Sequence, residues 1–310
     1  DDYEGAKAAF ERVLPNLVLL NFGDNIDATV TTEPARPNQE NFIELDHLKK
    51  ANIIAISNEK GGVAKTTSTL SLGAALAELN YRVLLVDLDP QANLSLALGV
   101  ETAESEITSA NVLIDSAAIK SAIRKTEMTN LELVPSNLRI MNAEQFLPMR
   151  SHYLITLHDA LEADSLMYDF ILLDCPPALG AITLNALSAA NLLIIPTKAE
   201  YFSAYALRNM MSSIRRVRQE SNTNIAYRIL VTMFEGSSRT DRNILKELKN
   251  TFGNGLFTSV IDIDTKLRES PIAGTPITQY RPASRGSQQY RALAHELIEY
   301  YKQEVNNPPA

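Results

Sequence analysis

Residues 59–67 read EKGGVAKTT. They lie between an apolar run at 53–56 and a segment at 68–79 whose leucines and alanines recur at helical spacing. The apolar run predicts a buried strand, and the recurrence predicts a helix. A strand, a glycine-rich loop and a helix that opens on lysine and threonine are typical of a phosphate-binding loop. Because Gly61 and Gly62 carry no Cβ, their backbone can curl until N–H groups point at a phosphate, and the helix N-terminus adds further donors.

Two side chains of this loop suit nucleotide chemistry. Lys65 can reach the β- and γ-phosphates, and the Thr66 hydroxyl can ligate Mg²⁺. The loop departs from the general pattern G-x-x-x-x-G-K-[ST], because Ala64 stands in place of the second glycine and an extra lysine, Lys60, stands at the front. A glycine-rich turn with solvated lysines is the alternative interpretation.

The form KGGVAKTT resembles the deviant Walker A motif of the ParA/MinD ATPases. In that family the first lysine reaches across a dimer interface to the partner's nucleotide, so the resemblance implies a catalytic role for Lys60 beside Lys65. It also implies ATP and Mg²⁺ as cofactors and a homodimer that forms on ATP binding. The nucleotide-binding residues implied in the loop are Gly61, Gly62, Val63, Ala64, Lys65, Thr66 and Thr67.

Strand-like and helical segments alternate from residue 51 onward. The expected strands are 53–56, 82–89, 131–135, 170–174, 192–195, 228–233 and 256–261, and the longer expected helices are 68–79, 138–150, 155–166, 204–219, 244–252 and 288–305. Shorter helical pieces are expected through residue 98 and at 117–125. The strands are continuously apolar, as in parallel sheets buried on both faces. This predicts an α/β fold with a doubly wound, mostly parallel sheet, which the resemblance makes a P-loop NTPase of the deviant Walker A type.

Three acidic residues follow predicted strands, at the sheet edge where such folds bind ligands. Asp87 and Asp89 lie in VDLDPQAN, which resembles the family's DxDPQ-N motif, and Asp174 ends the apolar strand FILLD, which resembles its Walker B. The resemblance implies that Asp87 lies in the Mg²⁺ shell and that Asp89 positions or activates the attacking water. A carboxylate after a buried strand is costly unless it meets a cation, and Mg²⁺ bound through water suits Asp174. Capping acids at strand–helix junctions are the alternative.

Two later motifs extend the resemblance. Glu200 lies in the stretch PTKAEYFSA, which is similar to the family's switch-like loop, and is expected to contact nucleotide or the signature lysine across a dimer. Met233 ends the sixth predicted strand, where the family reads adenine, although core packing explains it equally well. With softer motifs at 271–276 and 280–286, the resemblance covers roughly residues 53–297.

Composition narrows the class of protein. Hydrophobic residues are 45% and charged residues 21% of the 310, as in soluble globular proteins, and no 18 consecutive residues are apolar. Cys175 is the only cysteine, which excludes an intrachain disulfide, argues against an iron–sulfur cluster and favours the cytoplasm. Residues 51–310 are interpreted as the ATPase domain. Residues 1–50 are interpreted as an N-terminal arm and linker with a short helix at 3–14, and an unrelated tail is the alternative.

The net charge of −8 excludes a globally basic nucleic-acid binder, but the charge is uneven. Residues 205–250 hold nine basic and four acidic residues, whereas residues 1–50 hold five basic and ten acidic ones. Asp262 and Asp264 are acidic where partition proteins often carry a DNA-contacting arginine, which weakens the expectation of DNA binding. The candidate contacts to DNA are Arg215, Arg216, Arg218, Arg239, Arg242, Arg281 and Arg285.

The function that the resemblance implies first is a ParA-type ATPase. Its ATP-bound dimer would bind nonspecific DNA on the bacterial nucleoid and partition or position a plasmid, chromosome or protein assembly, with hydrolysis stimulated by a ParB-like partner or cargo adaptor. A MinD-like membrane ATPase is a weaker alternative, because residues 296–304 hold three acids and one lysine where a basic amphipathic helix is needed. A metabolic ATP-dependent ligase on the same fold is the other alternative, and Lys60 disfavours it.

Overall fold

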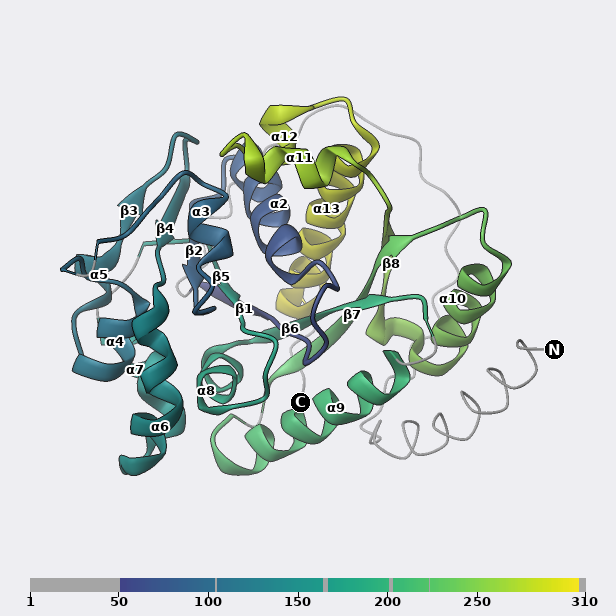
Figure 1. Cartoon of the computed structure of the whole chain (residues 1–310). Helices are drawn as coiled ribbons and strands as arrows, with labels where there is room; N and C mark the ends of the chain where they lie inside the picture. The colour runs from purple at the N-terminus through teal and green to yellow at the C-terminus, as the bar shows by residue number, and fades with distance from the viewer. Residues whose placement is uncertain (1–50, 104, 164–166, 201–202, 223, 307–310) are drawn as a thin grey trace.

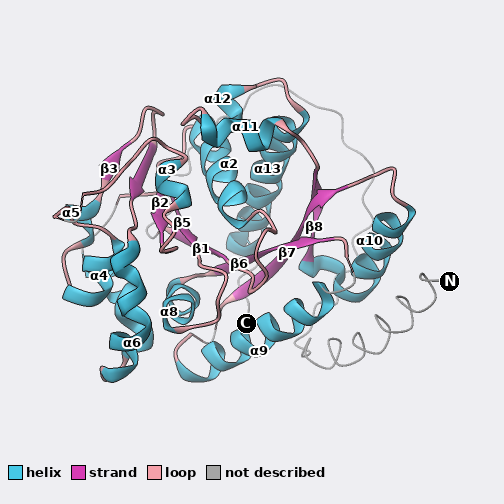
Figure 2. Cartoon of the chain, in the orientation of Figure 1, coloured by secondary structure: helices cyan, strands magenta, loops and turns pink. Residues whose placement is uncertain are grey.

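The apolar segments of the sequence form one eight-stranded sheet in the computed structural model, which describes residues 51–306 except 104, 164–166, 201–202 and 223. The predicted arm and linker therefore lie outside the described residues. The strand order is β3-β4-β2-β5-β1-β6-β7-β8, and all neighbouring pairs are parallel except β3 with β4 (Figures 1 and 2). The doubly wound, mostly parallel sheet expected from the sequence is confirmed. The strands are β1 Asn52–Ile56, β2 Val83–Asp87, β3 Arg124–Lys125, β4 Leu131–Val134, β5 Phe170–Asp174, β6 Leu192–Lys198, β7 Ala226–Phe234 and β8 Leu256–Asp262.

Helices cover both faces of this sheet. In Figure 1, α2 and α13 lie above the central strands and α8 and α9 lie below them. One face carries α2 Lys65–Glu78, α3 Asn93–Leu96, α11 Lys266–Ile272, α12 Ile277–Tyr280 and α13 Arg285–Asn306. The other carries α4 Ser109–Asp115, α5 Ile119–Ala122, α6 Ala143–Phe146, α7 Thr156–Ala163, α8 Ala181–Ala189, α9 Ser203–Glu220 and α10 Arg239–Phe252.

The central strands explain why the pattern is continuous rather than alternating. In β1, Ile53 and Ala55 pack with the core on the α8 side, while Ile54 and Ile56 pack with the core on the α2 side. Successive side chains of a strand point to opposite faces, so a strand covered on both sides needs apolar residues at every position.

The edge strand β8 is protected from further pairing by the side chains of α13. The backbone N–H groups of Thr258 and Ser259 donate to the Glu296 carboxylate at 2.6 and 2.8 Å, and that of Asp262 donates to Gln289 Oε1 at 3.0 Å. An edge strand with free N–H groups is a template for aggregation. Side chains of α13 therefore satisfy three N–H groups of this edge.

Two expected helices are wrong in their extent. Residues 138–150 do not form one helix but two 3₁₀ turns, η1 Leu138–Asn142 and η2 Leu147–Met149, around the single turn of α6, with Pro148 inside η2. Residues 117–125 form the short α5 followed by the edge strand β3. Helix α10 also begins five residues before the expected residue 244, because the Ser238 hydroxyl caps it by accepting the N–H of Asp241 at 3.2 Å.

The burial of the core leads to a prediction about stability. Leu172 is fully buried in β5, so Leu172→Ala should lower the free energy of unfolding by about 2–5 kcal/mol through lost burial and the cavity left behind. Leu138, which is 67% exposed, provides the control, and Leu138→Ala should change the same free energy by no more than about 0.5 kcal/mol. Urea unfolding of both variants measures the difference, and equal effects would contradict the assignment of the core.

Candidate active site

The loop between β1 and α2 has a backbone shaped to receive an anion. Gly62 and Ala64 both adopt left-handed backbone conformations, with φ of 68° and 63°. For an alanine this conformation costs roughly 1–2 kcal/mol, so the surrounding contacts must hold the loop in place. No side chain caps the start of α2, which leaves its first N–H groups available to a phosphate.

Neighbouring strands hold this loop. The Thr232 hydroxyl on β7 donates to the carbonyl oxygen of Val63 at 3.0 Å. Asn58 bridges the loop to β6, because its Nδ2 donates to the Pro196 carbonyl at 2.8 Å while its Oδ1 accepts the N–H of Lys60 at 3.0 Å. Hydrogen bonds therefore connect the strained loop to β6 and β7.

The two lysines of the loop have different environments. Lys65 is buried, and its Nζ donates to the Lys60 carbonyl oxygen at 3.1 Å. Burial lowers the pKa of Lys65, and the nearby negative charges of Asp174 and Asp89 oppose that shift. The ammonium of Lys60 instead meets Glu200 Oε1 at 2.5 Å, in a pair whose side chains are 31% and 43% exposed. Glu200 thus contacts the first lysine within one chain.

Asp87 and Asp174 end neighbouring strands and lie directly opposite each other in the β2–β5 register. Both are fully buried, and Asp89 is nearly so. The oxygens of Asp87 are satisfied by the N–H of Asp89 at 3.1 Å and by the N–H and hydroxyl of Ser95 at 2.9 and 2.7 Å. Burial still raises the pKa of Asp87.

Asp174 is less completely satisfied than Asp87. Its Oδ1 accepts the Thr69 hydroxyl at 3.0 Å, while its Oδ2 is buried and makes no hydrogen bond within the described part of the chain. Burial raises the pKa of Asp174, the adjacent Asp87 raises it further, and the hydroxyls of Thr66 and Thr69 oppose the rise.

These carboxylates fit Mg²⁺. Two buried acids side by side, one with an unpartnered oxygen, are costly without a cation, and a hydrated Mg²⁺ supplies both charge and hydrogen-bond donors. Among the described residues, no group of three or more acidic, histidine or cysteine side chains could form a direct metal cage. Asp87 and Asp174, with the Thr66 hydroxyl, could therefore hold the ion largely through its waters.

Two cavities flank the start of α2. One, of about 230 Å³, lies between the loop and the segment after β8, and its lining includes Met233, Arg268 and Tyr290. Met233 has a left-handed backbone with φ of 52°, an uncommon conformation for a non-glycine residue. The other, of about 410 Å³, extends from Thr66 toward α3 and α11, where Ile272 is largely exposed. The loop therefore lies in an open groove at the carboxyl ends of the strands, with Met233 on its wall.

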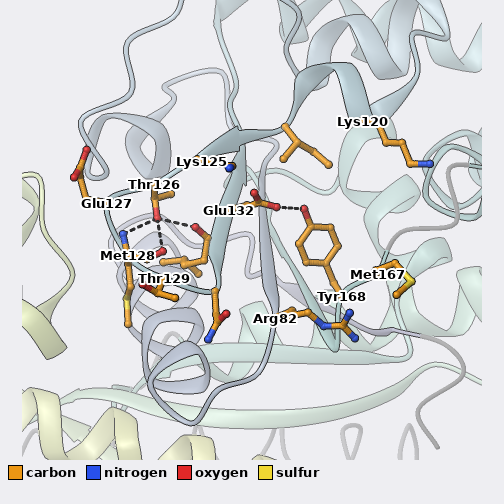
Figure 3. A pocket seen from close by; sticks show the side chains of 13 residues that line it. Arg82, Lys120, Lys125, Thr126, Glu127, Met128, Thr129, Glu132, Met167 and Tyr168 are labelled. Atoms are coloured by element: carbon orange, nitrogen blue, oxygen red, sulfur yellow. Dashed lines mark hydrogen bonds between the residues drawn. The ribbon is translucent and has the colours of Figure 1, made fainter. Parts of the chain in front are cut away.

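A separate cavity of about 650 Å³ lies at the amino ends of the strands, beside the turn between β3 and β4 (Figure 3). Some of its polar groups are already engaged within the chain. Arg82 pairs with Asp169 at 3.0 Å, and the Tyr168 hydroxyl donates to the Glu132 carboxylate. The buried acids of β2 and β5 are not among its lining residues, so this cavity is not part of the site around the loop.

The arginines that were expected to contact DNA lie in three separate parts of the structure. Arg215, Arg216 and Arg218 lie on α9, Arg239 and Arg242 lie on α10, and Arg281 and Arg285 lie near the start of α13. Several make local contacts: Arg216 pairs with Glu220 at 3.0 Å, Arg218 donates to the Ile225 carbonyl, and Arg285 pairs with Asp262 at 3.3 Å. The acidic Asp262 is thus matched by an arginine of the same chain.

Helix α10 carries the most regular basic surface among these. Its exposed cations recur at intervals of three, four and three residues, so they share one face of the helix. Leu248 and Phe252 on the opposite side anchor the helix in the core. The basic face of α10 consists of Arg239, Arg242, Lys246 and Lys249.

Three residues that support the site were missed from the sequence. Thr69 and Ser95 donate hydrogen bonds to the two buried acids, and each had a signal, since each is a hydroxyl residue two positions after a recognised motif. Glu144 had no signal. Its carboxylate crosses from α6 to accept the N–H groups of Ala181 and Ile182 at 2.6 and 3.3 Å, capping the helix that follows the Asp174 loop.

Comparison with known proteins agrees with this geometry. A family model described as "AAA domain" matches residues 51–227. The sporulation initiation inhibitor protein Soj of Bacillus subtilis is 38% identical over 247 residues, which are 79% of this chain and 97% of Soj. The chromosome partitioning protein ParA of Caulobacter vibrioides is 35% identical over 249 residues, which are 79% of this chain and 93% of that protein. The chain belongs to the ParA/MinD family of ATPases.

A solved structure is also similar. Cobyrinic acid a,c-diamide synthase of Mycobacterium smegmatis, crystallised with ADP and magnesium, has a TM-score of 0.70 and 31% identity, over 82% of this chain and 96% of that one. As a member of the ParA/MinD family, this chain is an ATPase that uses ATP and Mg²⁺.

The buried position of Lys65 in the loop leads to a prediction about ATP affinity. Lys65→Ala should weaken ATP binding by on the order of 100-fold, because a hydrogen-bonded cation contributes up to about 3 kcal/mol. Titration with a fluorescent ATP analogue measures the affinity. Lys125, an exposed lysine at the far cavity of Figure 3, is the control, and Lys125→Ala should bind like the wild type. Wild-type affinity in Lys65→Ala would contradict the phosphate-binding assignment.

Proposed function

We propose that this chain is a ParA-type partition ATPase. It forms an ATP-bound sandwich dimer, binds nonspecific DNA on the nucleoid and positions a cargo, and a partner protein stimulates its hydrolysis. Its membership of the Soj and ParA group supports the class of function. The observation that carries the proposal is the placement of Lys60, which lies at the front of the loop, is partly exposed and is directed to Glu200.

The proposed roles within one protomer follow from burial and charge. Lys65, with the backbone of residues 61–67 and the first turn of α2, binds the phosphates. Thr66, Asp87 and Asp174 hold Mg²⁺, which when bound neutralises phosphate charge during transfer. Asp89 holds the attacking water; its Oδ1 accepts the N–H of Gln91 at 2.8 Å, which orients the carboxylate at the mouth of the site. Met233 is proposed to border the base.

Dimerisation is proposed from the surface around Lys60. A cavity of about 460 Å³ lies beside it, lined by Pro177, Leu179 and the partly exposed Tyr205 among others. This surface consists of residues from the phosphate loop, from the loop after β5 and from the start of α9. A second protomer facing it would receive Lys60 near its own nucleotide, and Glu200 would lie at the same contact.

DNA binding is proposed to use the basic face of α10, with α9 and the start of α13 contributing. A monomer of net charge −8 should bind DNA weakly, since only a local basic surface can release counterions. Two protomers in one dimer present two such surfaces, and bivalent contact can raise avidity by roughly 10²-fold or more. ATP dependence then requires no base-specific residue.

Two other functions on this fold are weighed against the proposal. A MinD-like membrane ATPase would need a basic amphipathic helix, but residues 296–304 of α13 hold three acids and one lysine. Among the described residues, no helix combines the length and hydropathy that a membrane span requires. The likeness to cobyrinic acid a,c-diamide synthase keeps a metabolic ligase as the second candidate. ATP turnover that responds to a small-molecule acid and not to DNA would favour the ligase.

The dimer prediction compares two substitutions. Lys60→Ala should leave ATP binding by the monomer intact, because Lys65 and the loop N–H groups remain, but abolish ATP-dependent dimerisation and lower turnover by on the order of 10²-fold or more. Asp89→Ala should instead retain the dimer and lose hydrolysis. Light scattering with ATP and a phosphate-release assay separate the two, and a Lys60→Ala protein that dimerises and hydrolyses normally would contradict the cross-dimer role.

The DNA prediction uses charge-matched pairs. Lys246→Ala with Lys249→Ala should weaken DNA binding of the ATP-bound dimer. The pair should also flatten the salt dependence by about 0.9 log units of affinity per log unit of salt for each phosphate that is no longer neutralised. Lys120→Ala with Lys125→Ala removes the same charge near the opposite edge of the sheet and should change neither quantity. Binding of a random duplex between about 50 and 200 mM salt measures both pairs. Equal losses of affinity in the two pairs would show that only net charge matters.

A further inference from the structure

Thr69 lies one helical turn after Lys65 in α2 and is fully buried. Its hydroxyl oxygen is 3.0 Å from Asp174 Oδ1 and 3.1 Å from the Lys65 carbonyl oxygen. The contact to Asp174 joins residues 105 positions apart and connects the phosphate-loop helix to the end of β5. Thr69 itself lines neither of the cavities beside the loop.

We propose that Thr69 is a positioning residue for Mg²⁺: by holding Asp174 Oδ1, it directs the other carboxylate oxygen, Oδ2, to the hydrated ion. A hydroxyl has one hydrogen, so Thr69 donates to either Asp174 or Lys65 at any moment. An ionised carboxylate is a stronger acceptor than a peptide carbonyl, and a charge-assisted bond is roughly twice as strong as a neutral one. With Asp174 ionised, the hydrogen therefore points to Oδ1.

The two carboxylate oxygens of Asp174 explain how the Thr69 hydroxyl could direct this side chain to the ion. Oδ2 of Asp174 is the side-chain carboxylate oxygen that is buried and unpartnered within the described part of the chain. If Oδ1 is fixed, the carboxylate plane is fixed, and Oδ2 remains the oxygen that can accept from a water of the ion. Without the Thr69 hydroxyl, Oδ1 loses its hydrogen bond, and the carboxylate turns more easily about χ2, whose energy profile is broad.

Asp87 provides an internal comparison. Its carboxylate is held by the N–H of Asp89 and by both the N–H and the hydroxyl of Ser95, so two of its three bonds come from the backbone. The Asp174 carboxylate has no such backbone donor among its hydrogen bonds in the described structure. Its orientation therefore depends on side chains that substitution can remove, and Thr69 is the one bonded to Oδ1, whereas Asp87 keeps its backbone donors whatever side chain is changed.

The proposed role of Thr69 rests on the use of ATP and Mg²⁺ by the family and not on DNA binding or dimerisation. The quantity expected to change is the Mg²⁺ concentration that produces half of the maximal response, which we call the half-effect concentration. Removing a residue that orients a metal ligand typically lowers metal affinity by about 10- to 100-fold. A structural defect alone would lower the melting temperature without changing that concentration.

The test is a Mg²⁺ titration of Thr69→Val, which keeps the shape and removes the hydroxyl, with Thr69→Ala as the second variant in case valine prevents folding. Two readouts are taken at saturating ATP: the Mg²⁺ dependence of turnover, and the Mg²⁺-dependent rise in melting temperature with a non-hydrolysable ATP analogue. The half-effect concentration of Mg²⁺ should increase by about 10- to 100-fold in both readouts. Thr69→Ser restores the hydroxyl and should return it to the wild-type value.

Ser68 is the matched control. It is the preceding residue of α2, equally buried, and its hydroxyl bonds to the Tyr290 hydroxyl at 2.9 Å rather than to an acid. Ser68→Ala should lower the melting temperature but leave the Mg²⁺ half-effect concentration unchanged. A wild-type half-effect concentration in Thr69→Val or Thr69→Ala would overturn the proposal. A serine variant as impaired as the valine variant would overturn it too, since packing of the threonine methyl group would then be the cause.

Discussion

The structure depends on one electrostatic constraint, the placement of two carboxylates side by side at the buried ends of adjacent strands. Asp87 and Asp174 are opposite each other in the β2–β5 register and have no exposed surface. Two anions in such a site destabilise the fold unless a cation and hydrogen-bond donors meet them. Lys65 and Thr69 from α2, and Ser95 from α3, supply part of that compensation. In the proposed function, Mg²⁺ bound with ATP would complete it, and the site would then favour the loaded state.

The loop beside these acids carries local backbone strain. Ala64 adopts a left-handed conformation where a glycine would be less strained, and α2 begins without a capping side chain. Both features cost free energy in the absence of ligand, and both leave N–H groups unpaired at the position where a phosphate would bind. The bonds from Thr232 and Asn58 hold this arrangement, which ties the loop to β6 and β7.

The sequence predicted the parts of the molecule that depend on neighbouring residues. The strands, the loop and the acids at the strand ends follow from periodicity and motif spacing, because each is specified within a few positions. The contacts that complete the site are long-range. The family resemblance led us to expect Glu200 at the signature lysine, but across a dimer, whereas here it meets Lys60 of the same chain, 140 positions away. The cap of α8 by Glu144, from 37 positions away, was not expected. No local pattern encodes such pairs. The helix expected at 138–150 failed for a related reason, since Ile140, Ala143 and Leu147 are buried at spacings that α-helical and 3₁₀ turns both permit.

The Lys60–Glu200 pair would position the proposed catalytic lysine within one protomer by a weak ion pair that can be exchanged. Both side chains are partly exposed, so solvent screens their attraction, and such pairs contribute only about 0.2–1 kcal/mol. That attraction is small beside the attraction of a lysine to a polyphosphate in a partly desolvated interface. Exchange of Glu200 for a partner's phosphates would therefore cost little, and the proposed dimer would gain a charge contact that the monomer cannot form. A lysine held in a buried ion pair would have to break interactions worth roughly 3–5 kcal/mol for the same movement. The exposure of this pair is thus a requirement of the proposed cross-dimer role.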